Sequence, residues 1–358
     1  MPDAGPPVTQ DGPPERADTR YRVGCSSWLD PALIEAGTFY PAPRMTAEDR
    51  LRWYARFFEC VEVNATYYAL PSYQNSQLWA ERTPPGFEFG VKAYSLMTGH
   101  NPKASGLPKE FRALLPAPPP ASARGEIDRK HFPREALDLC FDWFRDALAP
   151  LAEAGKLSYI LFQLAPWVGH SPQALDYLAS LPERLPGWKL AVEFRNPSWI
   201  PNRTDEALRF LADHGLIYVA VDCPWQPFVP EATADWAVVR VHGRNVQGWQ
   251  AQRRGEQPTV QEKYDYCYTP EELRGFADTI KRFHGRARRV FIKFNNNNWD
   301  YPVRNALGFR QLLGQATPDL EALRTEYEAT HKERPRSRRA RLPFLPPKRS
   351  DVQGELSV

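Results

Sequence analysis

Cysteine is scarce in this 358-residue chain, and its five cysteines form no recognisable site. Their number is odd and no pair has Cys-x-x-Cys spacing, so neither a disulfide framework nor a paired-cysteine zinc site is expected. Three of them lie in apolar, strand-like runs, which is typical of reduced, buried thiols in a cytosolic protein. We therefore expect a cytoplasmic location.

Long apolar runs are also absent. No stretch is long enough to span a bilayer, and no basic start is followed by an apolar segment, so neither a membrane span nor a signal peptide is expected. The formal net charge of only +3 excludes a chain-wide polyelectrolyte. No Gly-x-Gly-x-x-Gly turn follows the first expected strand, which weighs against a dinucleotide-binding open sheet.

What the sequence does contain is a regular alternation of strand and helix patterns. Strands are expected at 21–26, 60–68, 87–93, 157–164, 189–196, 217–222, 236–242 and 289–296. Helices are expected between them at 47–58, 74–82, 135–154, 172–182, 204–214 and 270–283, and after the last strand at 303–314. This order predicts an α/β fold, a parallel eight-stranded (β/α)8 TIM-type barrel in a single domain over 21–316; an open doubly wound sheet is the alternative.

Three segments fall outside this pattern. Residues 1–20 are rich in Pro, Gly, Asp and Arg and are expected to be disordered. A Pro-rich insertion at about 99–134 is expected to be a lid, a binding loop or a disordered segment. Residues 317–358 are expected to form a disordered, basic, Pro-rich tail, with eight Lys or Arg between Lys332 and Arg349. Such a tail makes nucleic acid an alternative partner.

The strands have two different faces. In the strand at 189–196, the large apolar residues alternate with Ala191, Glu193 and Arg195. We align all eight strands by this alternation, which assigns Val219 and Val221 to the helix-facing side. The opposite face then presents a set of polar residues near the strand ends: Ser26, Glu62, Asn64, Lys92, Gln163, Glu193, Arg195, Asp222, Arg240, His242, Lys293 and Asn295. In a barrel these side chains point inward at the C-terminal mouth, where barrel enzymes place their chemistry.

The alternative interpretation is a buried ion network that only holds the barrel together. Such networks are often no more stabilising than apolar residues of the same size, so stability alone explains them poorly. Because every expected strand delivers a polar group to the same level, we favour a ligand or catalytic site.

The charges of this set predict the ligand. Four cations, Lys92, Arg195, Arg240 and Lys293, together with amides that include Asn296, predict a small anionic substrate, with phosphorylated compounds among the candidates. We expect an enzyme with acid–base chemistry of the hydrolase, lyase or isomerase type, in which Glu193 is the base and Glu62, His242 or Asp222 its partner. Lys92 or Lys293 could instead form a Schiff base if its pKa is lowered.

The same residues are also compatible with other functions. No cofactor is predicted, although Glu62, Glu193, Asp222 and His242 are the ligand types of a divalent metal. A metal-assisted phosphodiesterase, a nucleic-acid-binding protein and a non-catalytic ligand-binding barrel are therefore the alternatives. Aromatic residues after the strand ends, Trp199 among them, are expected either to stack on a ligand or to pack. His100 is expected to be solvated, and the sequence does not indicate an oligomeric state.

Several ordered motifs resemble one family. They are Phe39-Tyr-Pro41, Val61-Glu-Val-Asn-Ala-Thr-Tyr-Tyr68-Ala-Leu-Pro71, Phe89-Gly-Val-Lys-Ala93, Phe162-Gln-Leu164, Ala191-Val-Glu-Phe-Arg195 with Ser198-Trp199, Arg240-Val-His-Gly243, and Phe294-Asn-Asn296 with Asn305-Ala306. Over about 21–315 the chain is similar to the YecE-like family, domain of unknown function 72. The resemblance implies a TIM-type barrel, and the likeness of that family to barrel endonucleases suggests nucleic-acid or phosphate binding. The chain departs from the family pattern at Asn297 and around Trp299–Pro302.

Overall fold

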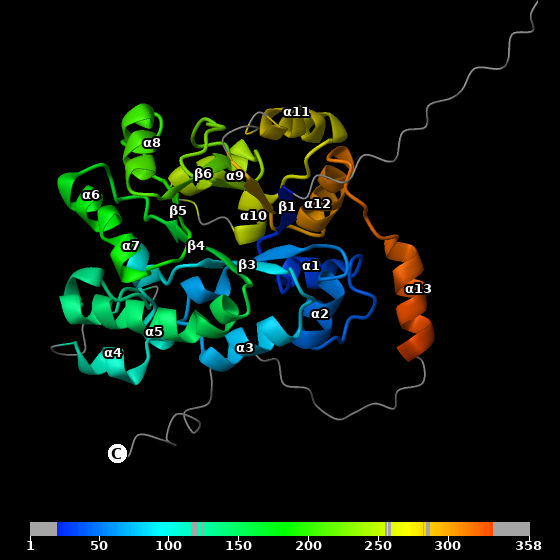
Figure 1. Ribbon diagram of the computed structural model, residues 1–358, viewed down its shortest axis with the longest axis horizontal. Helices are drawn as coiled ribbons and strands as arrows, with labels where there is room; N and C mark the ends of the chain where they lie inside the picture. The colour runs from blue at the N-terminus through cyan, green and yellow to red at the C-terminus, as the bar shows by residue number, and fades with distance from the viewer. Residues whose placement is uncertain are drawn as a thin grey trace, which may run out of the picture.

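The computed structural model describes residues 20–331, apart from 116–120, 124, 255, 257–258, 282 and 284–286. Its centre is a sheet of parallel strands in the order β1-β8-β7-β6-β5-β4-β3-β2 (Figure 1). The strands are β1 (Tyr21–Cys25), β2 (Cys60–Val63), β3 (Glu88–Lys92), β4 (Leu157–Gln163), β5 (Leu190–Glu193), β6 (Ile217–Asp222), β7 (Trp236–Val241) and β8 (Arg289–Phe294). The predicted TIM-type barrel is confirmed, in a nearly closed form.

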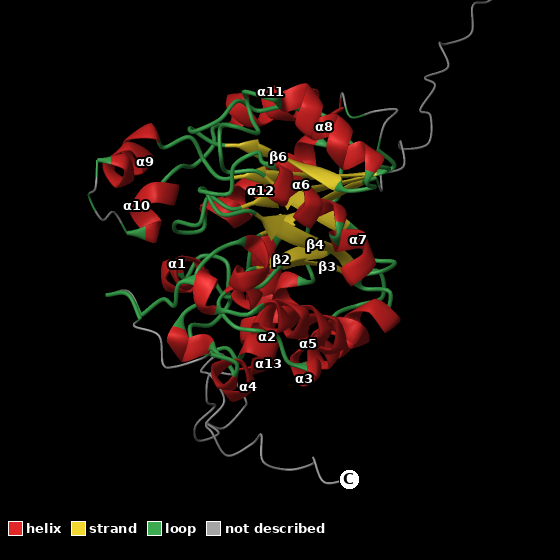
Figure 2. Cartoon of the chain, turned by 90° about the vertical axis from the view of Figure 1, so that its left-hand side faces the viewer, coloured by secondary structure: helices red, strands yellow, loops and turns green. Residues whose placement is uncertain are grey.

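Helices surround the sheet and account for the alternation in the sequence (Figure 2). They are α1 (Pro31–Ala36), α2 (Ala47–Tyr54), α3 (Tyr73–Glu81), α4 (Lys109–Ala113), α5 (Arg134–Glu153), α6 (Pro172–Ala179), α7 (Leu181–Arg184), α8 (Thr204–Asp213), α9 (Val246–Arg253), α10 (Val260–Tyr264), α11 (Pro270–Lys281), α12 (Tyr301–Leu312) and α13 (Leu320–His331). Helix α2 begins at a capping box made by Thr46 and Asp49. No helix in the described part of the chain is both long and apolar enough to cross a bilayer.

The barrel interior and the layer beneath the helices are two separate apolar clusters. The interior cluster contains Cys60, Tyr159, Leu161, Ala191, Ile217, Val219, Val221, Val238 and Phe291. The face assignment predicted from alternation is correct for seven strands, but it is wrong for β6. Val221 is in register with Arg240, and Asp222 is in register with Val241, so Val219 and Val221 face inward and Asp222 faces the helices.

The barrel is nearly closed because β1 and β2 meet without a regular hydrogen-bond ladder. Gly24 approaches β2 so closely that a Cβ atom there would lie 2.2 Å from the Cys60 carbonyl oxygen. The buried hydroxyl of Tyr54 bridges the two strands: it accepts from the Cys25 amide at 2.7 Å and donates to the Cys60 carbonyl at 3.1 Å. One side chain from α2 thus satisfies backbone groups of both strands at this seam.

Replacing Tyr54 with phenylalanine is expected to lower the free energy of unfolding by about 1–3 kcal/mol, because it leaves a buried amide and a buried carbonyl without partners. Urea denaturation followed by circular dichroism would measure the change. Tyr73→Phe is the control, since its side chain is 55 % exposed and its loss should change little. Equal stability of the two variants would show that the seam does not depend on the hydroxyl.

The C-terminal boundary predicted at residue 316 is wrong. Residues Leu320–His331 form α13, which packs beside α2: the Tyr327 and Trp53 rings lie 5.7 Å apart, and Arg56 pairs with Glu326 at 2.9 Å (Figure 1). The basic, Pro-rich composition of 317–358 as a whole conceals this acidic, amphipathic stretch at its start. The basic residues beyond it, like the expected disorder of residues 1–19, lie outside the described residues.

The Pro-rich insertion is folded over much of its described length. It contains the short helix α4, and an isolated bridge joins Lys103 to Glu126. Phe111 of α4 is fully buried and lies 6.1 Å from the Trp143 ring of α5. This part of the insertion is therefore anchored on the outer helical layer.

Candidate functional site

The guanidinium of Arg240 is the centre of the inward-facing polar groups. It donates to Glu62 Oε1 from Nε at 3.1 Å and from Nη2 at 2.8 Å, and to Glu193 Oε2 from Nη1 at 2.5 Å. Ser26 Oγ and Tyr159 OH donate to the two oxygens of Glu62 at 2.9 and 3.0 Å. All of these groups are buried, so strands β1, β2, β4, β5 and β7 are tied together through one charged network.

Both carboxylates in this network act as counter-ions. Burial alone would raise the pKa of Glu193, but the Arg195 and Arg240 guanidiniums overcome that effect and hold it well below its ordinary value. Glu193 has no exposed surface, and its oxygens contact Arg195 and Arg240. A carboxylate of such low basicity, already paired, is poorly suited to accept a proton from a substrate.

His242 is also a weak base. Its Nδ1 lies 2.8 Å from the amide nitrogen of Asn295, and its Nε2 lies 3.2 Å from Arg195 Nη2 and 3.4 Å from Arg240 Nη1. Burial, together with the Arg195 charge, lowers the pKa of His242 to about 3. The imidazole is therefore neutral at physiological pH and cannot serve as an effective general base there.

Lys92 is the basic group at the mouth. It stands at the end of β3, where its Nζ donates to Gln163 Oε1 at 3.2 Å and lies 4.3 Å from the centre of the Tyr67 ring. The same Gln163 oxygen accepts from Arg195 Nη2 at 3.1 Å and from Arg240 Nη1 at 3.2 Å. Burial and the nearby Arg240 charge lower the pKa of Lys92 to about 7, so a large fraction of this amine is neutral at pH 7.

Lys293 lies in the floor of the barrel, in register with Arg240 of β7 and Gly24 of β1. Its side chain has no exposed surface, and its Nζ has no hydrogen-bond partner. The Nζ lies 5.5 Å from the centre of the Phe291 ring, a contact that favours a cation in this floor.

Aromatic side chains form walls above this floor. Trp225, which follows β6, stacks with the Arg195 guanidinium at 4.6 Å and lies 4.3 Å from Trp249 of α9. Tyr264, at the end of α10, lies 5.9 Å from the His242 ring. Helices α9 and α10 project on one side of the barrel (Figure 2). Trp225 and Tyr159 were missed in the sequence, although Tyr159 has the same parity as Leu161 and was open to prediction.

Three predicted site residues lie elsewhere. Asp222, on the outer face of β6, accepts from Arg244 at 2.9 Å and from the Tyr268 hydroxyl. Trp199 is fully buried, stacks on Phe194 at 4.5 Å and donates to a backbone carbonyl. Asn296 donates to the Tyr266 carbonyl and to Asn305 at 2.8 and 2.9 Å. Trp199 and Asn296 lie after the strand ends, where the chain leaves the alternation, whereas Asp222 keeps the alternation of β6 and faces outward because that strand is reversed relative to the prediction.

The structure also places His100, the suggested metal ligands and Asn64. His100 is buried, not solvated: its Nδ1 contacts Thr98 Oγ1 at 2.8 Å and its ring packs on Tyr67 at 5.1 Å.

Among the described residues, no three His, Cys, Asp or Glu side chains converge in a way that could hold a metal ion. Of the four ligands suggested by the sequence, Asp222 faces outward, and Glu62 and Glu193 are bonded to Arg240. Asn64, by contrast, does reach the mouth, where its amide contacts Asn295 at 3.4 Å.

Residues 22–330 match the family model described as a protein of unknown function, DUF72. The chain belongs to the DUF72 family. It is 30 % identical over 298 residues to the UPF0759 protein YunF of Bacillus subtilis, covering 81 % of this chain and 94 % of that protein. The DUF72 match extends to residue 330, so it includes α13, in agreement with the corrected boundary.

Solved DUF72 structures share the fold. A family protein from Thermotoga maritima MSB8 is 28 % identical, with a TM-score of 0.62 and coverage of 82 % of this chain and 99 % of the other. A family protein from Enterococcus faecalis V583 is 24 % identical, with a TM-score of 0.65 and coverage of 84 % and 98 %. These likenesses support the barrel fold.

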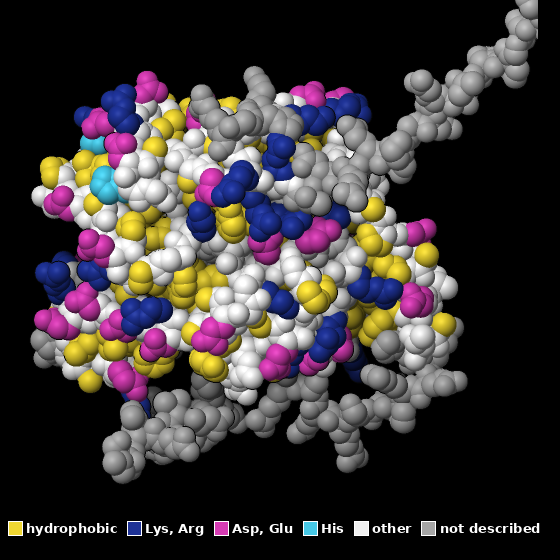
Figure 3. All heavy atoms as spheres, viewed as in Figure 1, with side chains coloured by type: hydrophobic (Ala, Val, Ile, Leu, Met, Phe, Trp, Pro, Cys, Tyr) yellow, Lys and Arg dark blue, Asp and Glu magenta, His cyan; other side chains and the backbone are white. Residues whose placement is uncertain are grey.

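The opposite face of this DUF72 barrel carries charges of a different kind. Arg22 and Arg289 pair with Glu88, and Lys189 and Arg288 pair with Asp235, around the N-terminal ends of the strands. Lys and Arg side chains are mixed with Asp and Glu over the middle of the face in Figure 3. These cations have carboxylate partners at the surface, unlike Lys92 at the mouth.

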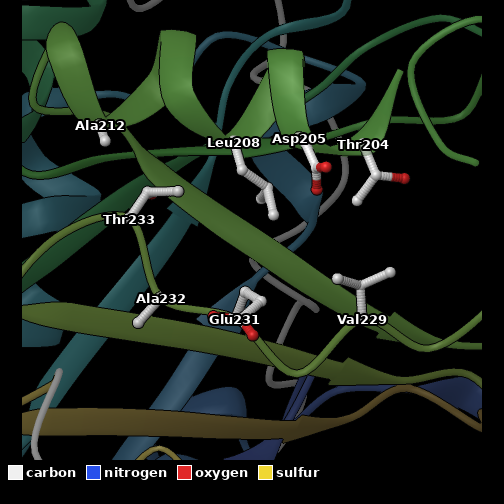
Figure 4. Close-up of a pocket in the computed structure, with 8 residues that line it drawn as sticks. All are labelled: Thr204, Asp205, Leu208, Ala212, Val229, Glu231, Ala232 and Thr233. Atoms are coloured by element: carbon white, nitrogen blue, oxygen red, sulfur yellow. The ribbon is translucent and has the colours of Figure 1, made fainter.

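A pocket of about 480 Å³ lies on the outside of the barrel, between α8 and the segment that precedes β7 (Figure 4). It is lined by Thr204, Asp205, Leu208, Ala212, Val229, Glu231, Ala232 and Thr233. None of the inward-facing polar groups contributes to it. We therefore place the candidate site at the mouth of the barrel and not in this pocket.

Proposed function

We propose that the chain is an enzyme that binds a small anionic substrate at the C-terminal mouth of the barrel. The charge balance of the inward-facing groups carries this proposal. Glu62 and Glu193 are both bonded to Arg240, whereas Arg195, Lys92 and Lys293 bring further positive charge to the same end of the barrel interior. Because this part of the interior is largely shielded from water, a bound anion would interact with these cations more strongly than at an exposed surface.

The proposal assigns different tasks to the cations. Arg240 is saturated by the two carboxylates and fixes the floor. Arg195 shares Glu193 with Arg240, but its side chain is 9 % exposed and its guanidinium also faces Trp225 and Gln163, so it is the group that we assign to hold an anionic oxygen. Proton transfer is assigned to Lys92 instead of Glu193, since a base with a pKa near 7 accepts and returns protons at physiological pH.

Sulfate is a suitable probe, because its charge is constant across neutral pH. Isothermal titration calorimetry is expected to show sulfate binding that weakens at least tenfold in Arg195→Gln, through loss of the clamping charge. Arg244→Gln is the matched control, since Arg244 pairs with Asp222 on the other face of the barrel wall and should leave the affinity unchanged. Circular dichroism would confirm that both variants are folded.

The pH dependence gives a second readout of the same site. Above pH 7 Lys92 loses its charge, so sulfate affinity is expected to fall as the pH rises from 6 to 8. Lys92→Gln should remove this dependence, whereas Arg195→Gln should keep it. If sulfate bound to wild type and Arg195→Gln with the same affinity, anion binding at the mouth would be disproved.

The nucleic-acid alternative depends on the basic tail after residue 331, which lies outside the described residues, and it stays a prediction. The non-catalytic alternative shares the anion site. It differs from the proposal only in giving Lys92 no chemical role.

A further inference from the structure

We infer that Lys92 forms a covalent imine with the carbonyl carbon of an aldehyde or ketone that also bears an anionic group. This inference rests on the proposed function, because the anionic group would be held by Arg195 while the carbonyl meets the amine. It adds the substrate class, and it gives the Lys92 amine a covalent role in place of the proton transfer assigned to it above.

The surroundings of Lys92 favour a nucleophilic amine. Its Nζ contacts one neutral amide oxygen and one aromatic face, and no carboxylate of the described residues lies within ion-pair distance of it. A lysine paired with a carboxylate keeps its proton, and then it has no lone pair to attack with. Two guanidiniums share the Gln163 oxygen with Lys92, and neighbouring cations of this kind favour the neutral amine.

The other buried lysines lack this combination. Lys293 has no exposed surface and lies in the floor, out of reach of a ligand at the mouth. Lys156 donates to the carbonyls of Ala80 and Thr83 at 2.6 and 2.7 Å and to Thr83 Oγ1 at 3.0 Å, so its ammonium is held by backbone acceptors. Among these three lysines, only Lys92 combines partial exposure, a place at the mouth and the absence of strong acceptors.

The position of Arg195 sets the size of the ligand. Arg195 Nη2 and Lys92 Nζ both contact Gln163 Oε1, at 3.1 and 3.2 Å, so one small molecule can reach both. The anionic group and the carbonyl should then be only a few bonds apart, as in a 2-oxo acid or a short phosphorylated aldehyde. The Trp225 and Tyr67 rings bound this space on the Arg195 and Lys92 sides.

The step itself balances without an added oxidant or reductant. The neutral Nζ attacks the carbonyl carbon, the C–N bond forms, and a proton moves from nitrogen to the former carbonyl oxygen. The carbinolamine oxygen then takes up a second proton from solvent, equivalent to the one that the Lys92 ammonium released when it became neutral, and leaves as water. The C=N bond forms as the C–O bond breaks, and the nitrogen keeps its remaining hydrogen and so carries the positive charge. The protonated imine has the charge that Lys92 had, over the same Tyr67 ring, and it withdraws electrons from the adjacent carbon. Proton loss or C–C cleavage at that carbon would follow.

Reductive trapping tests this inference on the full-length wild-type protein. Glyoxylate, which carries an aldehyde beside a carboxylate, would be added with sodium cyanoborohydride at pH 7, and modified lysines located by peptide mass spectrometry. Methyl glyoxylate is the matched probe without the charge. We expect Lys92 to be modified by glyoxylate at least tenfold faster than exposed lysines such as Lys103, with this preference lost for the ester and suppressed by sulfate.

The outcomes separate this inference from the proposed function. If Lys92 is modified no faster than Lys103, the imine is disproved, and sulfate calorimetry then shows whether anion binding survives on its own. If Lys92 is modified equally fast by the acid and the ester, recognition of the anion is disproved. Lys92→Arg should lose the preferential modification and keep sulfate binding, so loss of both together would point to a damaged fold, which circular dichroism of the variant would reveal.

Discussion

Replacing Arg240 with methionine is expected to lower the free energy of unfolding by about 3–5 kcal/mol. Arg240 donates to both Glu62 and Glu193, and none of the three side chains is more than 1 % exposed. Without the guanidinium, Glu62 keeps only hydroxyl donors and Glu193 keeps Arg195, so buried negative charge loses its main compensation. Urea denaturation at pH 7 would measure the loss.

Arg244→Met is the control for this variant. Arg244 also pairs with a carboxylate, Asp222, at 2.9 Å, but its side chain is 41 % exposed, so its removal should cost less than about 1 kcal/mol. Adding Glu62→Gln to Arg240→Met should recover part of the lost stability by removing one uncompensated charge. A cost for Arg240→Met no greater than that for Arg244→Met would contradict the central role of the network.

The same network predicts how acid affects the fold. The pKa of Glu193 is held well below its ordinary value of 4.5, so below pH 4.5 the unfolded chain takes up a proton that the folded chain refuses. The stabilisation from Glu193 is therefore complete above pH 4.5 and is lost progressively as the pH falls toward the lowered pKa. In Arg240→Met this loss should be smaller, because one of the two charges that lower the pKa is gone.

Lys92→Met is expected to have the opposite effect and raise the free energy of unfolding by up to about 4 kcal/mol at pH 7. The pKa of Lys92 falls from an ordinary value of 10.5 to about 7 in the folded protein, so folding at neutral pH opposes protonation of this amine. Methionine has a similar length and pays no such penalty. Chemical denaturation of both proteins at several pH values would test this.

The lowered pKa of Lys92 also predicts the direction in which the free energy of unfolding changes with pH. Between pH 7 and 10.5 the unfolded chain binds more protons at Lys92 than the folded chain, so wild-type stability should rise with pH across this window. The gain from Lys92→Met should shrink over the same window and vanish near its upper end. Lys156→Met is the contrasting variant: it removes three hydrogen bonds and should destabilise the protein. A destabilised Lys92→Met would show that Lys92 is a structural cation.

The fold was predictable because most strands have one helix-facing and one interior face of different polarity. Before Asp222, strand β6 is apolar on both faces, so its alternation carries no information about which side faces inward. The assignment of its faces depended on the single charged residue, Asp222, and it exchanged the inward-facing and the helix-facing sides of the strand. Register with β7 decides the matter, and register cannot be read from one sequence.

Outside β6, the candidate site was predictable up to the last residue of each strand and less so beyond it. Glu62, Glu193 and Arg240 lie within strands, where period two fixes the direction of the side chain. Trp199 and Asn296 lie after strands, where a turn redirects them to the outer layer. Whether an inward group is a base or a counter-ion depends on pairing distances, which no sequence pattern contains. The amphipathic spacing of α13, by contrast, was available and overlooked.

The seam between β1 and β2 has a consequence for the order of events during synthesis. The ladder partner of β1 is β8, with Tyr21 in register with Val290, whereas β2 offers it little beyond the Tyr54 bridge. The first strand to leave the ribosome must therefore wait for the last one before its backbone hydrogen bonds can form. Until then the nascent chain exposes two unpaired strand edges, at β1 and at the newest strand, to neighbouring chains and to chaperones.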